Sequence, residues 1–207
     1  MPCLDGQFLQ WDDGVYVKGN SHIRELSAET VGWALTAGRA TNWHPLTWLS
    51  HALDHQIYGL ERPWGHHLTS VIIHAVNTGL LLVLLYRLTG RPWVSVVAAA
   101  VFALHPLRVE CVAWVSERKE LLCASLSLVA LLAYARYVAR PSVRRYLLIV
   151  AALVAALMSK PMAVSLPAVM LLLDMWPFKR LSWRALAEKV PLAVLGVASC
   201  VVTFLVQ

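Results

Sequence analysis

Residues Leu68–Leu88 read LTSVIIHAVNTGLLLVLLYRL, an apolar stretch whose single formally charged side chain is Arg87. A helix needs about 20 mostly apolar residues to cross a lipid bilayer, so this stretch predicts a transmembrane helix. The whole chain of 207 residues has a similar character, with 58% hydrophobic and 14% charged residues and a mean hydropathy of +0.60. A soluble domain of that composition would lack the polar residues that its surface requires. The sequence therefore indicates an integral membrane protein.

Five more apolar segments follow the first one. Together they predict an all-α fold, a polytopic membrane helical bundle of about six spans, in which the fourth and fifth segments are short or interrupted by proline. Short connections favour antiparallel neighbouring helices. The expected spans are residues 68–88, 92–107, 121–138, 146–158, 161–178 and 190–207.

The basic residues test this segmentation, because lysine and arginine collect in the cytoplasmic loops of membrane proteins. Alternate connections hold ten basic residues and one acid, Glu188, whereas residues 1–67 and 105–120 together hold ten acids and seven bases. We therefore expect the basic connections in the cytoplasm, and residues 1–67, the 105–120 loop and the turn at Lys160 on the outer face. The ten basic residues are Arg87, Arg91, Arg136, Arg140, Arg144, Arg145, Lys179, Arg180, Arg184 and Lys189.

Residues 1–67 form the expected extracytoplasmic region, and residues 68–207 form the expected bundle. Apolar residues at helical spacing predict two short interfacial helices in the outer region, one after an N-cap at Ser27 and one over Pro45–Tyr58. An outer N-terminus needs a preceding signal or span, and the chain stops inside an apolar segment at Gln207. We therefore expect a chain that is incomplete at both ends.

Four polar residues interrupt the apolar sequence, where an unpaired charge is costly. His74, Asn77 and Asp174 are expected to face protein rather than lipid. Lys160 precedes Pro161 at the outer end of a predicted helix, and an ammonium group there suits an anionic lipid phosphate. The long side chain could equally extend to the membrane interface without binding a ligand.

Asp12 and Asp13 are adjacent carboxylates in the outer region. One carboxylate can accept a proton as a general base while its neighbour positions the acceptor or a metal ion, two roles that need unequal surroundings. Adjacent acids in a loop are also commonly solvated, so the pair alone is a weak signal. His51 and His55 are four residues apart on a predicted helix and can place two imidazoles on one divalent metal ion, although packing or hydrogen bonding would also explain them.

Two other kinds of site are not indicated. The basic residues are divided among three short loops rather than gathered in one stripe, so the sequence pI near 9.4 predicts no nucleic-acid partner. The four cysteines have no CxxC spacing, and we expect neither a cysteine zinc site nor a disulfide framework.

Six motifs follow one another along nearly the whole chain: Trp11–Asp13, Asn42–His51, Gly65–Leu68, Phe102–Glu110, Trp114–Lys119 and Ser159–Met162. Together they resemble the bacterial relatives of the transmembrane and tetratricopeptide-repeat (TMTC) O-mannosyltransferases. The resemblance implies a C-type glycosyltransferase, a multispanning enzyme that takes a sugar, here mannose, from a polyprenyl-phosphate donor on the non-cytoplasmic side. The implied partners are the lipid-linked sugar, membrane lipid and a protein acceptor, and the implied location is the inner (plasma) membrane.

The resemblance also assigns roles to residues. It maps the catalytic signature onto Asp12 and Asp13, and a second acidic site onto Glu110. The basic residue near the donor phosphate maps onto Lys160 or Arg118. His44, His105 and Trp43 lie in or beside the shared motifs and are further substrate-binding candidates.

Two other functions compete with the transferase. A non-catalytic membrane scaffold would use the module only as an anchor for soluble repeats, and would tolerate loss of Asp12 and Asp13. Half of a transporter would carry Lys160 and Asp174 along its substrate path, but the acids and histidines crowd on one face rather than at the midplane expected of a carrier.

Overall fold

The computed structural model describes residues 6–9, 11–37 and 43–206, and within these residues the regular structure is entirely helical. Cys3, Asn42 and Gln207, which belong to the cysteines, the second motif and the last expected span, lie outside the described residues. The N-terminal part contains a π-helical turn at Gly14–Lys18, a 3-10 turn at Ser21–Ile23, and the helices α1 (Ala28–Thr36) and α2 (Pro45–Tyr58).

Local sequence accounts for the ends of these elements. The Ser27 hydroxyl accepts a hydrogen bond from the backbone N–H of Thr30 at 3.2 Å, which confirms the predicted N-cap. Helix α2 has the predicted bounds, and it begins with proline at its first position, where a missing N–H costs nothing. The two predicted short helices of the outer region are therefore present.

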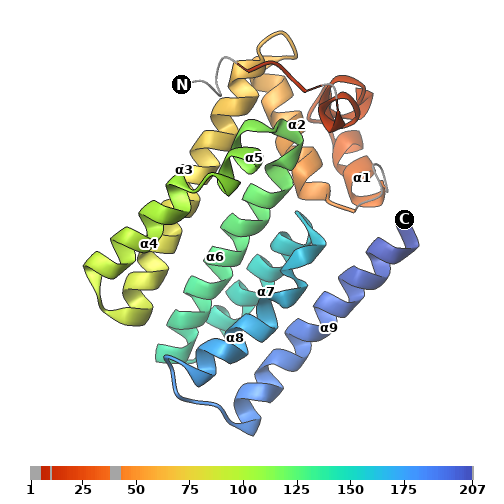
Figure 1. The fold of residues 1–207 in the computed structure, drawn as a ribbon. Coiled ribbons are helices and arrows are strands. Elements are labelled where there is room, and N and C mark those ends of the chain that lie inside the picture. The colour runs from red at the N-terminus through yellow and green to blue at the C-terminus, as the bar shows by residue number, and fades with distance from the viewer. Residues whose placement is uncertain (1–5, 10, 38–42, 207) are drawn as a thin grey trace.

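The helices of the bundle alternate in direction (Figure 1). They are α3 (Pro63–Thr89), α4 (Pro92–Leu104), α5 (Leu107–Ala113), α6 (Arg118–Ala139), α7 (Val143–Leu157), α8 (Leu166–Met175) and α9 (Trp183–Val206). A 3-10 turn at Val115–Glu117 precedes α6, and another at Pro161–Ser165 precedes α8.

The prediction of six spans is only partly confirmed. Among the described residues, three helices are long and apolar enough to cross a membrane: Pro63–Thr89, Val115–Ala139 and Trp183–Leu205. Helices α4 and α5 would make a fourth span if they act as one, but they are bent by 61°. The expected spans at 146–158 and 161–178 form α7 and a 3-10 turn followed by α8, both shorter than a full crossing.

The bend between α4 and α5 has a local cause. Pro106 disfavours a helical conformation at the residue before it, and His105 adopts an extended backbone with ψ of 130°. The His105 Nδ1 then accepts a hydrogen bond from the Leu107 backbone N–H at 3.2 Å, at the start of α5. The predicted span 92–107 therefore ends early, and α5 turns across the top of the bundle (Figure 1).

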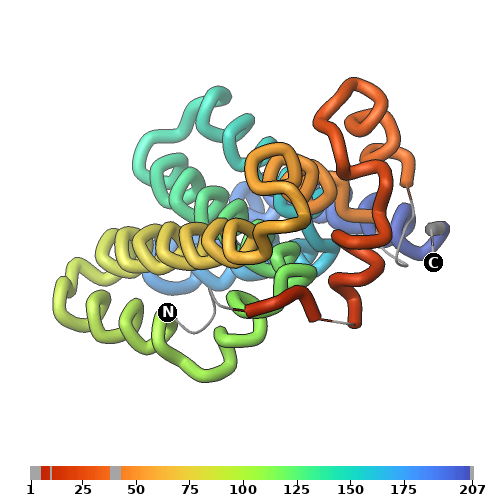
Figure 2. The backbone as a smooth tube through the Cα atoms, turned by 90° about the horizontal axis from the view of Figure 1, so that it is seen from above, coloured from red at the N-terminus to blue at the C-terminus, as the bar shows by residue number. Residues whose placement is uncertain are grey.

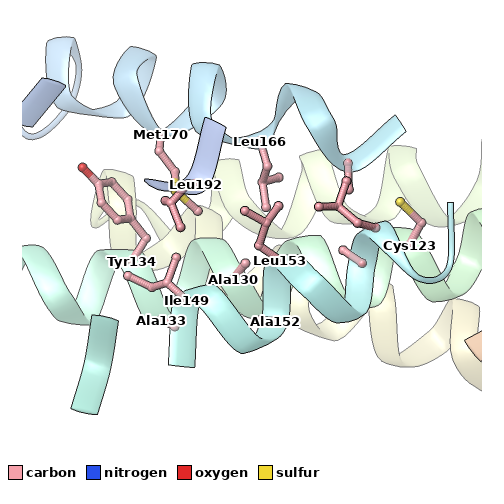
Figure 3. Close-up of a cluster of buried hydrophobic side chains, with 13 residues drawn as sticks. Cys123, Ala130, Ala133, Tyr134, Ile149, Ala152, Leu153, Leu166, Met170 and Leu192 are labelled. Atoms are coloured by element: carbon pink, nitrogen blue, oxygen red, sulfur yellow. The ribbon is translucent and has the colours of Figure 1, made fainter. Parts of the chain in front are cut away.

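The core of the bundle lies among α6, α7, α8 and α9. Small residues on α6 and α7, including Ala130, Ala133, Ala152 and Ala156, are buried and let the two helix backbones approach closely. Figure 3 shows Met170 of α8 and Leu192 of α9 reaching into the same cluster. A second apolar cluster gathers around Trp48 of α2 and includes Val115, so it joins the N-terminal part to the start of α6.

The basic connections all lie at one end of the bundle, and the N-terminal helices, α5 and the turn before α8 lie at the other (Figure 1). The Thr47 hydroxyl donates to the Ser159 carbonyl at 3.2 Å, and the Leu46 N–H donates to the Met158 carbonyl at 3.2 Å. These bonds attach α2 to the Lys160 turn. The three segments expected on one face therefore do share an end of the molecule.

Candidate functional site

Asp13 fastens the N-terminal segment to the start of α6. Its side chain is fully buried, and its two carboxylate oxygens accept backbone N–H groups from Leu9 and from Ser116, each at 2.9 Å. Ser116 lies 103 residues further along the chain. A buried carboxylate is stable only when its oxygens are satisfied in this way, so Asp13 is built into the scaffold of this end.

Asp12 lies in a different environment from its neighbour. Its side chain is exposed and close enough to Tyr16 for its charge to act on the phenol. It accepts no hydrogen bond from the described residues. The two adjacent acids thus have the unequal surroundings that a division of labour between them requires.

A cleft of about 370 Å³ lies between the N-terminal segment and α5. Figure 2 shows the N-terminal segment, in red, passing beside the green α5 region. Leu9, which Asp13 holds through its backbone, forms part of one wall, and Glu110 of α5 forms part of the opposite wall. The cleft is lined by Gly6, Gln7, Leu9, His67, Val109, Glu110, Ala113 and Trp114.

The side chain of Arg118 does not line this cleft. It is fully buried, where it donates to the carboxylate of Asp54, to the His66 carbonyl at 2.6 Å and to the Ser50 hydroxyl at 3.4 Å. A guanidinium already held by these partners cannot bind a donor phosphate in this conformation. The structure therefore gives Arg118 a scaffold role and leaves Lys160 as the basic candidate.

Lys160 lies in the turn between α7 and α8 and is half-buried. Its ammonium group pairs with the carboxylate of Glu120 at the start of α6. Burial lowers the pKa of Lys160, an effect partly offset by the negative charge of Glu117. Cys111 of α5 lies close enough to Lys160 and Glu110 for both charges to act on its pKa. Lys160 is therefore near the helix that forms one wall of the cleft.

His44 belongs to the apolar core of the N-terminal part. Its ring stacks on Tyr16 with centroids 5.4 Å apart and packs against Trp48 at 4.6 Å. Burial lowers the pKa of His44 to about 3, with a smaller contribution from Lys119. The structure places this candidate within the core and away from the cleft.

Trp43 lines a separate apolar groove of about 180 Å³ whose other lining residues belong to the end of α7 and to α9. Its indole N–H donates to the Leu35 carbonyl at 2.8 Å, which fixes the ring. The groove is lined by Trp43, Val154, Leu157, Met158, Leu195, Ala198, Ser199 and Val202. Because Met158 is two residues from Lys160, the groove approaches the Lys160 turn.

The remaining candidates lie elsewhere. His105 is exposed and, with Arg108, lines a different hollow beside His74 of α3. His51 is buried on α2 with its ring edge toward Tyr16, and burial lowers its pKa well below the usual value. No group of three or more histidine, cysteine or acidic side chains able to hold a metal ion occurs among the described residues. His51 and His55 therefore remain a candidate pair without a third ligand in that part of the chain.

The polar residues inside the apolar sequence face protein, as expected. Asn77 donates to the Leu121 carbonyl at 2.9 Å, and His74 Nε2 lies 3.1 Å from the Ala103 carbonyl oxygen. At the opposite end from the cleft, buried Asp174 pairs with Arg180 and Lys189. Asp174 is thus part of an ion cluster at the basic end.

Sequence reasoning missed two residues of the cleft and one scaffold partner. His67 and Trp114 line the cleft, although both belong to the motifs that carried the resemblance, and that membership was the available signal. The scaffold partner is Asp54, which precedes His55 in the sequence and pairs with Arg118, 64 residues away. No local pattern predicts a pair so distant in sequence.

Comparison with known proteins gives a consistent set of relatives. The chain is 33% identical over 140 residues to protein O-mannosyl-transferase Tmtc2 of Drosophila melanogaster, a match covering 64% of this chain and 15% of that protein. It is 35% identical over 101 residues to TMTC2 of Homo sapiens, covering 49% of this chain and 12% of the relative. It is 31% identical over 157 residues to TMTC4 of Homo sapiens, a match covering 64% of this chain and 20% of that protein.

The matches thus span at most about a fifth of these relatives. No family model and no solved structure matches the chain. The relatives are the protein O-mannosyl-transferases that the motifs indicated.

Proposed function

We propose that this chain, a relative of the TMTC protein O-mannosyl-transferases, is the part of a membrane glycosyltransferase that carries its catalytic acids. It would transfer mannose from a polyprenyl-phosphate donor to a hydroxyl group of a protein acceptor. The observation that carries the proposal is the attachment of the Asp12–Asp13 motif to the 105–120 region through the Asp13 bond to Ser116. That bond ties the segment that carries the exposed Asp12 to a position two residues from Trp114, which lines the cleft together with Glu110.

The exposed Asp12 is the better candidate for the general base. Transfer requires the acceptor hydroxyl to lie behind the anomeric carbon and to lose its proton as the new bond forms. Asp12 is free to approach a hydroxyl, whereas both oxygens of Asp13 already accept backbone N–H groups. Asp13 would then act as a positioning residue that holds Asp12 and the cleft wall.

Lys160 is proposed to face the donor phosphate. The departing phosphate carries negative charge, and a fixed cation beside it stabilises the transition state. Glu120 holds the Lys160 ammonium in the structure, and a phosphate would replace or share that contact. Met158, two residues before Lys160, lines the apolar groove that also contains Trp43, which supports this groove as a path for the prenyl chain.

The active face is proposed to be extracytoplasmic, with the chain spanning the inner (plasma) membrane. Ten basic residues lie in the connections or in the adjoining helix turns at one end of the bundle, and such residues favour the cytoplasmic side. The cleft lies at the other end. A membrane-bound donor would then reach the site from the side, between helices.

The test is mannose transfer from polyprenyl-phosphate mannose to protein in membranes, comparing the parent with Asp12→Asn and Asp13→Asn. Asp12→Asn should abolish transfer while leaving the melting temperature of the purified protein unchanged. Asp13→Asn should also reduce transfer, but with a lower melting temperature, because an amide nitrogen replaces one oxygen that accepts a backbone N–H.

Glu25→Gln is the matched control, because Glu25 is an exposed acid of the same region outside the cleft. It should retain full transfer. Undiminished transfer by Asp12→Asn would remove Asp12 as the base, and equal transfer by all four proteins would contradict the catalytic role of the pair.

A further inference from the structure

The connection between α6 and α7 and the start of α9 lie at the end of the bundle opposite the cleft beside α5 (Figure 1). Between them is a hollow of about 720 Å³, which we call the α7–α9 hollow. Its lining includes Tyr137 of α6, Tyr146 of α7 and Pro191 of α9. Its volume lies within the range of about 300–1,000 Å³ that is typical of ligand sites, and the proposed transfer reaction uses none of its residues.

Arg184 lines this hollow and has no partner of its own. Its side chain is exposed, and it forms no hydrogen bond or ion pair with the residues that the structure describes. Two other basic residues of this end, Arg180 and Lys189, both pair with buried Asp174. A guanidinium group has the charge and the donor geometry to bind a phosphate, so Arg184 is available to an anionic ligand in the hollow.

The acid in the lining, Glu188, does not cancel this positive charge. Its carboxylate accepts a hydrogen bond from the Tyr137 hydroxyl at 3.1 Å and is also paired with Arg180. The Tyr146 hydroxyl donates to the Glu188 backbone carbonyl at 2.8 Å, so both tyrosine rings are fixed in the wall. Further arginines that form no ion pair with the described residues lie close by in the sequence, at positions Arg136, Arg140, Arg144 and Arg145.

Exposed tryptophans indicate the depth of the hollow in the membrane. Trp93 lies in the first turn of α4, Trp176 directly follows α8, and Trp183 begins α9, all at the basic end. Each of them has more than half of its surface exposed, and tryptophan is enriched at the level of the lipid head groups. Because Arg184 directly follows Trp183, the hollow lies at that level. Basic pockets between membrane helices at this depth suit the head groups of anionic lipids.

We propose that the α7–α9 hollow binds the head group of an anionic phospholipid, with Arg184 contacting its phosphate. Ser142 also lines the hollow, and its oxygen accepts the Arg145 N–H at 3.4 Å, which leaves its own O–H to donate to the ligand. An acyl chain would follow α9, where helical spacing places Val194, 61% exposed, on the same face as the lining residue Ala187. The site is independent of the proposed transferase activity, because it lies at the opposite end of the molecule.

The test measures lipid binding to the protein purified in a non-ionic detergent. Native mass spectrometry gives the dissociation constants for phosphatidylglycerol, for phosphatidylcholine with the same acyl chains, and for glycerol phosphate. Arg184→Gln removes the charge at similar side-chain length, whereas Ala187→Trp fills the hollow without changing the charge. Arg87→Gln is the matched control, because Arg87 is an exposed arginine of the same end that does not line the hollow.

The parent should bind phosphatidylglycerol more tightly than phosphatidylcholine. Arg184→Gln should reduce that preference about 5-fold, the effect of one basic residue beside anionic lipid. Ala187→Trp should weaken phosphatidylglycerol binding by at least about 10-fold, because the indole occupies the space of the head group. Arg87→Gln should keep the parent values. Melting temperatures identify a variant that fails to fold, and the other variant then decides the outcome.

Four results would overturn the proposal. Equal affinity of the parent for the two lipids would show that the hollow does not recognise an anionic head group. Equal losses in Arg184→Gln and Arg87→Gln would mean that the lipid is attracted by the basic end as a whole. Undiminished binding in Ala187→Trp would place the lipid elsewhere. Glycerol phosphate bound as tightly as phosphatidylglycerol would make the hollow a site for a soluble phosphate.

Discussion

Arg118 illustrates how burial changes what a charged residue does. From the sequence it is one of two candidates for a phosphate contact, yet it is fully buried and paired with Asp54. A buried pair contributes little net stability, but removing one partner leaves an uncompensated charge and costs about 3–5 kcal/mol. The position of Arg118 thus depends on Asp54, 64 residues earlier.

This pairing predicts the effect of substitutions on stability. Arg118→Met should lower the free energy of unfolding by about 3–5 kcal/mol, because Asp54 is left buried and charged. Adding Asp54→Asn should recover a large part of that loss. The measurement is a double-mutant cycle by thermal or denaturant unfolding in detergent. Additive losses from the two single variants would contradict a coupled pair.

His44 makes stability depend on pH. Its pKa in the folded protein is about 3, below the value near 6.5 of an unfolded chain. As pH falls below 6.5, His44 binds a proton in the unfolded state but not in the folded state. The free energy of unfolding therefore declines by about 1.4 kcal/mol per pH unit until pH approaches 3. Above pH 6.5 this contribution is constant.

The expected result is a shallower pH dependence in His44→Phe, which keeps a ring against Tyr16 and Trp48 but cannot titrate. Unfolding measured in detergent between pH 7 and pH 4 gives the comparison. The variant should retain some slope, because burial also lowers the pKa of His51. Parallel curves for parent and variant would show that folding does not lower the pKa of His44.

At the residue scale, the proposed roles of Asp12 and Asp13 require unequal environments, and the structure leaves Asp12 exposed and buries Asp13. Which acid is buried was not predictable, because the bond from Ser116 N–H to Asp13 forms only when segments 103 residues apart meet. His44 shows the same limit. Its motif indicated a functional residue, whereas its position between Tyr16 and Trp48 is a consequence of tertiary packing.

At the scale of elements, the helix ends that follow local rules were predictable. Helix α2 begins at Pro45 and ends at Tyr58 as expected. The expected span 92–107 stops at Leu104, because the effect of Pro106 on the residue before it outweighs the apolar composition. Composition predicts that a segment is buried or in lipid, but it does not fix where one helix bends into the next.

The close packing between the end of α2 and the start of α3 gives a prediction at this scale. A Cβ atom added at Gly65 would lie 2.2 Å from the Tyr58 ring, whereas one added at Gly79 on the same helix meets nothing within 4 Å. Gly65→Ala should therefore destabilise the protein by about 1–3 kcal/mol through overpacking. Gly79→Ala should be neutral or stabilising by up to about 1 kcal/mol, because alanine favours a helix.

Thermal unfolding in detergent tests the pair of variants. Because both change glycine to alanine within α3, the difference between them isolates the contact with Tyr58. A combined Tyr58→Ala and Gly65→Ala variant should show no additional loss from the second change. Equal stability of the two single variants would mean that the ring moves aside without cost.

At the scale of the whole molecule, charge placement predicted the grouping of segments better than apolarity predicted the number of spans. The connections that precede α7 and α9, whose first turns contain Arg144 and Arg184, lie at one end, and the turn at Lys160 lies at the other (Figure 1). The expected spans at 146–158 and 161–178 nevertheless form short helices. Such helices reach only part of the way across a bilayer, and they pack against α6 and α9, so protein rather than lipid surrounds part of their surface.

The grouping predicts which parts of the molecule a membrane-impermeant reagent can reach. In a background without the four native cysteines, Glu25→Cys places a thiol at an exposed position of the N-terminal part, and Leu181→Cys places one at an exposed position of a basic connection. If basic connections lie in the cytoplasm, a charged maleimide added to intact cells should modify the first thiol and not the second.

Lysed cells provide the control, because both thiols should then react to the same extent. The reverse labelling pattern in intact cells would place the cleft in the cytoplasm, and a donor carried on the outer leaflet could not reach it. Equal labelling of both positions before lysis would show that no membrane separates the two ends. Only the expected pattern puts Asp12, Glu110 and Lys160 on the side where an extracytoplasmic transfer would take place.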